Sequence, residues 1–599
     1  MDIVKNRELI QAEKMADEGD YKEALEQVLA FEKKNDLSDI DQILSFLLKS
    51  SLLINLSQFD EGFKSAEKAY QKSKKLGLDL YSVDASILMG KALTRLQKLD
   101  ESLDVILQAE SLLKSIPKIS QKELMQREAS LVTVKSYAFF YKGDGDNTLK
   151  YMEQSLTLRE ELGNKKEIIE TLSYMGHGYL IYKSDLDLAL KFAERCQALV
   201  EEVNVKSVRF PLAMNLLNFG NIYSQKGVID RALKYHKDSF SILEELNDNE
   251  YMAATLGNIA SIYLEKGEIE QCLETYKNVL KIQEKVGNDW YISLGFLNLI
   301  QALVETGDIP QAKSYLEQFQ RYHNQVNNDF ANNCYRLSLA MVLKTSSRTH
   351  DRAKSEELLK QVIEEDIFSN LNLDALIHLC DLFLIELRIT NDLEILDDIQ
   401  PYIDQLLDFA EMNQSYTFLC ETYLLQARIA LLTYDIKKTR RLLIQAHQIA
   451  KRHDLRRLVE TILNEHEELI KQLDTWKRLK KMKAPLSERM ELSQLNTQIK
   501  RMVRKGLSVS IQISEETVTV HKDKKVCLVC KGEALGFTYI CKCDVIYCEN
   551  CARALSDLEN VCWVCNTPID SSKPIKPFLL DEEKIDLKPS DKKLKKSEK

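Results

Sequence analysis

Apolar residues recur three and four positions apart along most of the first 480 residues, which is the periodicity of amphipathic helices. Three blocks align without gaps at a spacing of 40 residues, beginning at Asn218, Asn258 and Asn298. In each block a glycine separates two apolar-periodic halves, and these glycines are Gly227, Gly267 and Gly307. The pattern predicts a helix, a short turn and a second helix in every unit, because glycine readily adopts the left-handed backbone that ends a helix.

Weaker copies of the same unit extend in both directions, from Tyr21 to about Ile436. Asp308 and Pro310 suit the N-cap and first turn of a second helix. Counting these copies predicts about eleven helix pairs over residues 1–470, capped by a long helix after Leu455. The expected fold class is therefore an all-α repeat solenoid.

These units resemble the tetratricopeptide repeat family, and more narrowly the ~40-residue units of Pins-type adaptors and MalT-type regulators. The resemblance implies a right-handed superhelix whose concave groove holds a protein or an extended peptide. It would place the amides of Asn218, Asn258 and Asn298 in a column on the inner helices, where they could bracket a peptide backbone as donors and acceptors. The alternative is that these amides form hydrogen bonds between neighbouring repeats.

Charge and hydropathy exclude several function classes. The formal net charge of −10 is spread over 82 basic and 92 acidic residues, which gives no electrostatic reason to expect nucleic-acid binding by the whole chain. No signal-peptide core and no run of ~18 apolar residues occurs, so we expect no membrane insertion and a cytoplasmic location. The phosphate-binding, zinc-protease and serine-hydrolase motifs are also missing, and an active site in the array is not expected.

Residues 471–524 form a basic stretch that we interpret as a linker. It continues the capping helix, contains a second helix near 486–505, and ends in an alternating apolar and polar pattern that predicts a short β-hairpin. Its basic helix could contact nucleic acid or an acidic partner, or serve as a charged spacer. Residues 571–599 are rich in lysine and contain scattered proline, which is typical of a disordered tail.

Cysteine placement carries the clearest chemical signal. Eight of the 13 cysteines fall within 39 residues of the segment 525–570. They form four pairs, C-x2-C, C-x-C, C-x2-C and C-x2-C. Eight thiols supply two closed tetrahedral sets, the arrangement of structural Zn²⁺, and metal binding would stabilise a segment too short for an adequate core. Disulfides are disfavoured in the expected reducing compartment, whereas an iron site remains an alternative.

Four paired half-sites resemble the cross-brace zinc modules, namely RING, FYVE and PHD fingers. The resemblance implies two Zn²⁺ ions, one held by Cys527, Cys530, Cys548 and Cys551, the other by Cys541, Cys543, Cys562 and Cys565. It also implies a short helix after Cys551. The basic FYVE motif that reads phosphoinositides is absent, because Tyr539-Ile540-Cys541-Lys542 stands there.

RING features are partly met. Leu528, Trp563 and Val564 match positions that form the groove for a ubiquitin-conjugating enzyme in that family, although they could equally be the small core of the module. Asn566 stands where many active RING ligases have arginine. We therefore predict a protein-interaction scaffold with a RING-like module that could act as a ubiquitin ligase. The alternatives are a non-enzymatic adaptor or, less favoured, a nucleic-acid-associated regulator.

Overall fold

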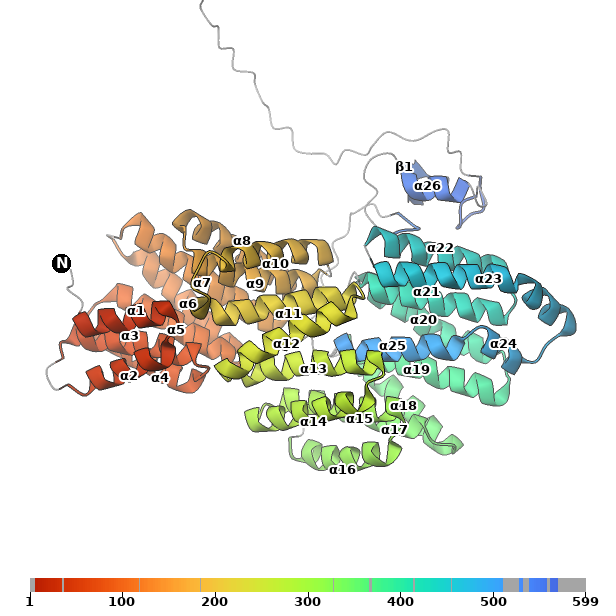
Figure 1. Cartoon of the computed structure of the whole chain (residues 1–599), viewed down its shortest axis with the longest axis horizontal. Coiled ribbons are helices and arrows are strands. Elements are labelled where there is room, and N and C mark those ends of the chain that lie inside the picture. The colour runs from red at the N-terminus through yellow and green to blue at the C-terminus, as the bar shows by residue number, and fades with distance from the viewer. Residues whose placement is uncertain are drawn as a thin grey trace, which may run out of the picture.

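The computed structural model describes residues 6–34, 37–117, 119–183, 185–326, 328–365, 369–412, 415–453, 455–509, 527–531, 538–543, 545–556 and 561–568. Within these residues the chain is almost entirely helical, and its only sheet is a two-stranded hairpin near the C-terminus. The first 22 α-helices form eleven consecutive pairs, which confirms the all-α repeat solenoid (Figure 1).

The first five pairs comprise ten helices: α1 Arg7–Glu18, α2 Tyr21–Glu32, α3 Asp39–Asn55, α4 Phe59–Lys75, α5 Asp79–Arg95, α6 Leu99–Ser115, α7 Gln121–Lys142, α8 Gly145–Leu162, α9 Lys165–Tyr182 and α10 Leu186–Val200. A short 3-10 helix, η1 Val205–Val208, then leads into the next pairs.

The remaining six pairs comprise twelve helices: α11 Arg209–Gln225, α12 Ile229–Leu246, α13 Asn249–Lys266, α14 Ile269–Val286, α15 Asp289–Thr306, α16 Ile309–Val326, α17 Asp329–Lys344, α18 Thr349–Glu365, α19 Ser369–Thr390, α20 Ile395–Met412, α21 Tyr416–Leu432 and α22 Ile436–Arg452. The capping helix predicted after Leu455 is α23, Arg456–Met482.

The predicted turns form as the glycine and capping pattern requires. Gly267 follows α13 with φ +76°, and its backbone N–H bonds back to the end of that helix. Asp308 accepts a hydrogen bond from the backbone N–H of Gln311 through its carboxylate, which caps α16. Gly220 is required for a different reason: a Cβ at this position would lie 2.5 Å from the ring of His236, so only glycine lets α11 and α12 approach this closely.

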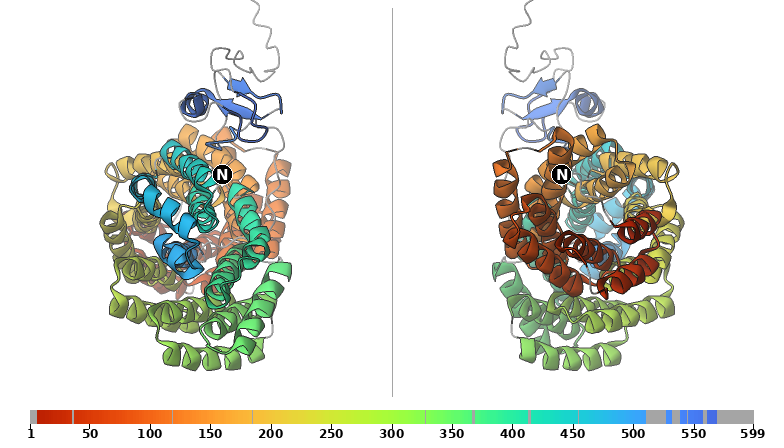
Figure 2. Two further views of the ribbon diagram at one scale, coloured as in Figure 1. Left: turned by 90° about the vertical axis from the view of Figure 1, so that its right-hand side faces the viewer. Right: turned by 90° about the vertical axis from the view of Figure 1, so that its left-hand side faces the viewer.

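Residues of one turn of the superhelix contact residues of the next turn. The side chain of Lys206, in η1, bonds to Asp20 in the α1–α2 turn, 186 residues earlier. Arg457, at the start of α23, pairs with Glu265 near the end of α13, 192 residues earlier. About five helix pairs therefore complete one turn, and the axial views in Figure 2 show the resulting ring of helices.

The inner side of the second turn is covered by a later segment of the chain. After α23, the short helix α24 (Leu486–Leu492) and α25 (Leu495–Val509) return to the array, where α25 contacts α13, α15, α19 and α21. Through Arg504, this part of the predicted linker is packed against the array. A single helix was expected near 486–505, but left-handed backbone at Gln494 (φ 51°) divides the stretch into α24 and α25. The hairpin predicted at its end lies outside the described residues.

Candidate functional site

The eight clustered cysteines are brought together by a small hairpin and one helix. Strands β1 (Thr538–Ile540) and β2 (Ile546–Cys548) pair antiparallel, with Tyr539 opposite Tyr547. Helix α26 (Glu549–Ser556) follows directly and carries Cys551, so the helix expected after this cysteine begins two residues before it.

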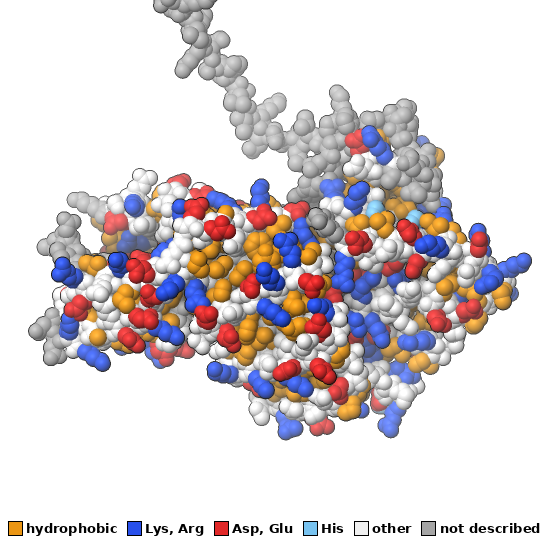
Figure 3. Space-filling model, in the orientation of Figure 1, with side chains coloured by type: hydrophobic (Ala, Val, Ile, Leu, Met, Phe, Trp, Pro, Cys, Tyr) orange, Lys and Arg blue, Asp and Glu red, His pale blue; other side chains and the backbone are white. Residues whose placement is uncertain are grey.

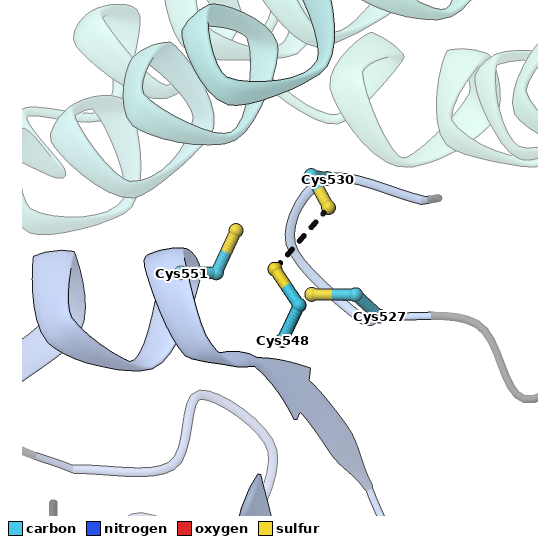
Figure 4. Close-up of side chains that lie close together, drawn as sticks. All are labelled: Cys527, Cys530, Cys548 and Cys551. Carbon is cyan, nitrogen blue, oxygen red and sulfur yellow. Dashed lines mark hydrogen bonds between the residues drawn. The ribbon is translucent and has the colours of Figure 1, made fainter. Parts of the chain in front are cut away.

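The thiols gather into two interleaved groups. Cys527 and Cys530, in the turn before the hairpin, face Cys548 and Cys551 (Figure 4). The second group contains Cys541, Cys543, Cys562 and Cys565. Within each group all Sγ atoms lie within 4.8 Å of one another. These are the two sets that the cross-brace resemblance implied.

The sulfur positions fit a tetrahedral ion. Zn–S bonds of ~2.3 Å place sulfur atoms roughly 3.8 Å apart along each edge of a tetrahedron. The Sγ–Sγ distance is 3.7 Å between Cys530 and Cys548, and 3.6 Å between Cys543 and Cys562. Four thiolates would complete the coordination of one Zn²⁺, so each group can hold a structural ion and leaves no position open for a reacting water.

Tyr547 joins the two thiol groups and was not anticipated from the sequence. It lies on β2 beside Cys548 of the first group, yet its hydroxyl is 3.1 Å from the Sγ of Cys562 in the second. The same hydroxyl accepts a hydrogen bond from the backbone N–H of Trp563 at 3.1 Å. Its side chain is fully buried, so it supports the second group from inside the module. Its only sequence signal is its position next to Cys548.

The first thiol group also forms the contact between the module and the solenoid. Arg452 of α22 donates to the Sγ of Cys530 at 3.3 Å, and Gln445 of the same helix donates to the backbone carbonyl of Leu528 at 3.2 Å. Lys531 forms an ion pair with Glu411 of α20 at 2.7 Å. Cys565 of the second group, by contrast, is exposed.

The three RING-like positions differ in their surroundings. Leu528 is half-buried in the knuckle that faces α22. Trp563 is half-buried against the core of the module, whereas Val564 is 58% exposed. Asn566 adopts left-handed backbone with φ 56° and directly follows the second group. Leu528 and the Trp563–Val564 pair thus belong to different knuckles, and their role in binding a partner stays a prediction.

The three repeated asparagines lie on the first helices of their pairs. Asn218 is fully buried in α11, and its amide nitrogen donates to the carbonyl of Ser173 at 2.7 Å, while its oxygen lies 2.9 Å from the ring nitrogen of His177. Asn258 donates to Asn221 at 3.0 Å, and Asn298 is buried in α15. Asn218 and Asn258 thus connect neighbouring repeats. Peptide binding by this column stays a prediction.

A glutamate on the inner side of the second turn was not among the predicted site residues. Glu421 of α21 is fully buried and accepts hydrogen bonds from Gln498 at 2.9 Å and Arg501 at 2.8 Å, both on α25. A signal for this arrangement was present in the sequence, because α15 and α21 carry apolar residues on every side, as helices covered on every side do.

Comparison with known protein families matches one part of the helical array. The family described as "Tetratricopeptide repeat" matches residues 211–285, which span α11 to α14. No curated protein matches the chain. Among the described residues, no helix has the combination of length and apolar character needed to cross a membrane.

Solved structures that resemble this chain are similar at low identity. A Rap protein complexed with Competence and Sporulation Factor is 15% identical, covering 63% of this chain and 99% of that chain, with a TM-score of 0.45. The apo quorum sensor NprR from B. thuringiensis is 17% identical, covering 60% and 97%, with a TM-score of 0.42. Aspartyl phosphate phosphatase F from Bacillus subtilis is 12% identical, covering 62% and 95%, with a TM-score of 0.41. The structure is an all-α repeat solenoid in which residues 211–285 match the tetratricopeptide repeat, and its two C-terminal cysteine groups could each bind a metal ion.

Proposed function

We propose that this protein is a cytoplasmic protein-interaction scaffold. Its solenoid binds a protein or extended peptide on the inner helices, and its C-terminal module, held together by two Zn²⁺ ions, recruits a second partner. The observation that supports this proposal most directly is α25, a segment of polypeptide bound across the inner faces of four helices from different repeats. A surface that holds one helix in this way has the shape and chemistry to hold polypeptide.

The geometry of the module supports the recruitment of a second partner at its C-terminal knuckle. The first knuckle is engaged with α22, whereas Val564 of the last knuckle is exposed and Trp563 is partly accessible. In the RING-like form of the proposal, Leu528, Trp563 and Val564 contact a ubiquitin-conjugating enzyme, and the module acts as a ligase without reacting groups of its own. Both ions would be structural, since four thiolates close each coordination sphere.

Reconstituted ubiquitin transfer tests this form of the proposal. The zinc-loaded full chain, with activating enzyme, a panel of conjugating enzymes and ubiquitin, should form chains, and Trp563→Ala should reduce the rate at least tenfold while two zinc ions remain bound. Lys542→Ala is the matched control, because Lys542 is exposed on the module outside the proposed surface. If no conjugating enzyme discharges ubiquitin faster with the protein than without it, ligase activity is ruled out and the non-enzymatic adaptor is favoured.

The nucleic-acid-associated regulator is a separate candidate because basic side chains gather around α23 and α25. Arg457 and Arg504 are about half exposed there, whereas acidic and basic side chains alternate over most of the face drawn in Figure 3. Binding through these side chains should weaken steeply as salt increases. An absence of measurable affinity for DNA or RNA at 50 mM salt would exclude this candidate.

A further inference from the structure

Three helices of the second superhelical turn are built to be covered on their inner side. In α15 every residue from Ile292 to Leu303 is buried, and α19 and α21 are likewise buried around most of their circumference. A helix that only lines an open concave face keeps a polar stripe toward water. These inner faces therefore require a segment that covers them, and α25 is that segment.

The occupant, α25, is a basic amphipathic helix. Its buried ridge consists of Leu495, Ile499, Met502 and Val503, each no more than 2% exposed. Its opposite edge carries Thr497, Lys500 and Arg504, which are exposed. Hydrogen bonds at both ends of α25 position it on the solenoid. Gln301 of α15 donates to the backbone carbonyl of Val503 at 3.3 Å. Arg428 of α21 donates to the backbone carbonyl of Gln494 at 2.5 Å.

Acidic side chains of the solenoid match the charge of this helix. Glu421 is fully buried, and its carboxylate lies 2.8 Å from the Nε atom of Arg501. Glu305 of α15 lies 3.7 Å from Arg504, and burial raises its pKa above the ordinary value. A buried carboxylate without a cation is strongly disfavoured, so this surface needs a positively charged helix whenever it is occupied.

We propose that the inner surface formed by α13, α15, α19 and α21 is a binding site for a basic amphipathic helix of a partner protein, and that α25 is its resident occupant. This inference rests on the proposed scaffold function and names the partner class for the second turn. A partner helix that presents an apolar ridge and an arginine to Glu421 replaces α25. Tethering gives α25 an effective concentration on the order of millimolar, so a free helix competes only when α25 is weakened or the partner binds more tightly.

Peptide exchange tests the site with a probe taken from the chain itself. A fluorescent peptide covering residues 493–509 should bind the full-length variant Met502→Asp with one-to-one stoichiometry, since an aspartate on the buried ridge drives α25 off the surface. Binding to the wild-type chain should be at least tenfold weaker because α25 competes in cis. A peptide that itself carries Met502→Asp is the matched control and should not bind.

Two further measurements make the result decisive. Glu421→Gln, added to the Met502→Asp chain, should weaken peptide binding about tenfold, because the carboxylate no longer pairs with arginine. In the wild-type chain, hydrogen exchange of the amides of α25 should occur through a local opening that leaves α15 and α19 protected.

The proposal fails if the peptide does not bind a Met502→Asp chain whose circular dichroism is unchanged. It also fails if the amides of α25 exchange only with those of α15 and α19, which would make α25 a permanent part of the core. Neither experiment needs loaded zinc sites or a conjugating enzyme. Failure here together with active ubiquitin transfer would therefore leave the scaffold function standing, whereas peptide binding without transfer would remove only the ligase form.

Discussion

Individual side chains help to position the cysteines of the two candidate metal sites, and Tyr547 is the clearest example. Its hydroxyl contacts the Sγ of Cys562 and accepts from the N–H of Trp563, although the residue belongs to the strand that carries a ligand of the other group. Partners that orient metal ligands contribute to metal affinity even though they do not touch the ion. Tyr547 therefore couples the order of the second site to that of the first.

We predict that Tyr547→Phe weakens only the second metal site. Loss of the hydroxyl removes the support of Cys562, and the affinity of one of the two ions should fall roughly 10- to 100-fold. Competition with a zinc chelator should then show two separated release steps instead of two similar ones. The first site serves as the internal control, and an equal loss of both ions would contradict the proposed role of the hydroxyl.

Buried histidines should make stability dependent on pH, and His236 isolates the effect. The ring is 1% exposed against Gly220, and burial lowers its pKa from 6.5 to about 3. The unfolded chain takes up a proton near pH 6.5 and the folded chain does not, so this contribution to stability is complete above pH 6.5 and is lost as the pH falls toward 3. At pH 5 the loss amounts to about 2 kcal/mol.

The comparison that checks this is the melting temperature of wild type and His236→Gln at pH 7.5 and pH 5. The wild-type value should fall further than that of the variant, since glutamine does not titrate. Asp374 has the opposite effect on the pH dependence of stability, because burial raises its pKa to about 7. It contributes equally to the wild type and the variant. Parallel pH profiles would exclude His236 as the source.

At the scale of elements, the metal groups should behave as two independent four-ligand sites. Cys548→Ser and Cys565→Ser each remove one thiol from a different group, and each variant should retain one zinc per chain where wild type holds two. Elemental analysis of purified protein gives this number directly. Because Cys530 of the first group and the neighbouring Leu528 contact α22, only Cys548→Ser should also increase amide exchange in residues 445–452.

The helices follow from sequence patterns because each depends on local spacing: Gly267 adopts the left-handed backbone that ends α13 after an apolar-periodic run. The division of the thiols into two interleaved groups was implied by the cross-brace resemblance, and the structure brings the same cysteines together. The position of α25 could not be predicted in the same way. Its ridge predicts an amphipathic helix, but the surface it covers is assembled from helices up to about 250 residues earlier in the chain. Only the apolar residues on every side of α15 indicate that some segment must cover it.

At the scale of the whole molecule, stacking of successive turns determines the shape of the solenoid, and Arg95 is the central contact. The guanidinium, at the end of α5, lies 2.9 Å from Asp248 and 3.4 Å from Glu250, both at the start of α13 in the next turn. It also lies over the rings of Phe59 and Tyr251, at 4.5 and 5.3 Å from their centroids. This one side chain thus connects helices from two superhelical turns.

Arg95→Ala should therefore open the molecule as well as destabilise it. Asp248 is 2% exposed, and leaving its carboxylate buried without a cation should cost about 3–5 kcal/mol. Small-angle scattering should show a larger radius of gyration at a temperature where helicity is intact, because the contact joins turns and not neighbouring repeats. Arg195→Ala is the matched control: its pair with Glu160 is 49% and 39% exposed, and losing it should cost no more than about 1 kcal/mol and leave the radius unchanged. If neither variant increases the radius of gyration, the turns are held together by their many backbone and loop contacts. The guanidinium of Arg95 would then stabilise only its own surroundings.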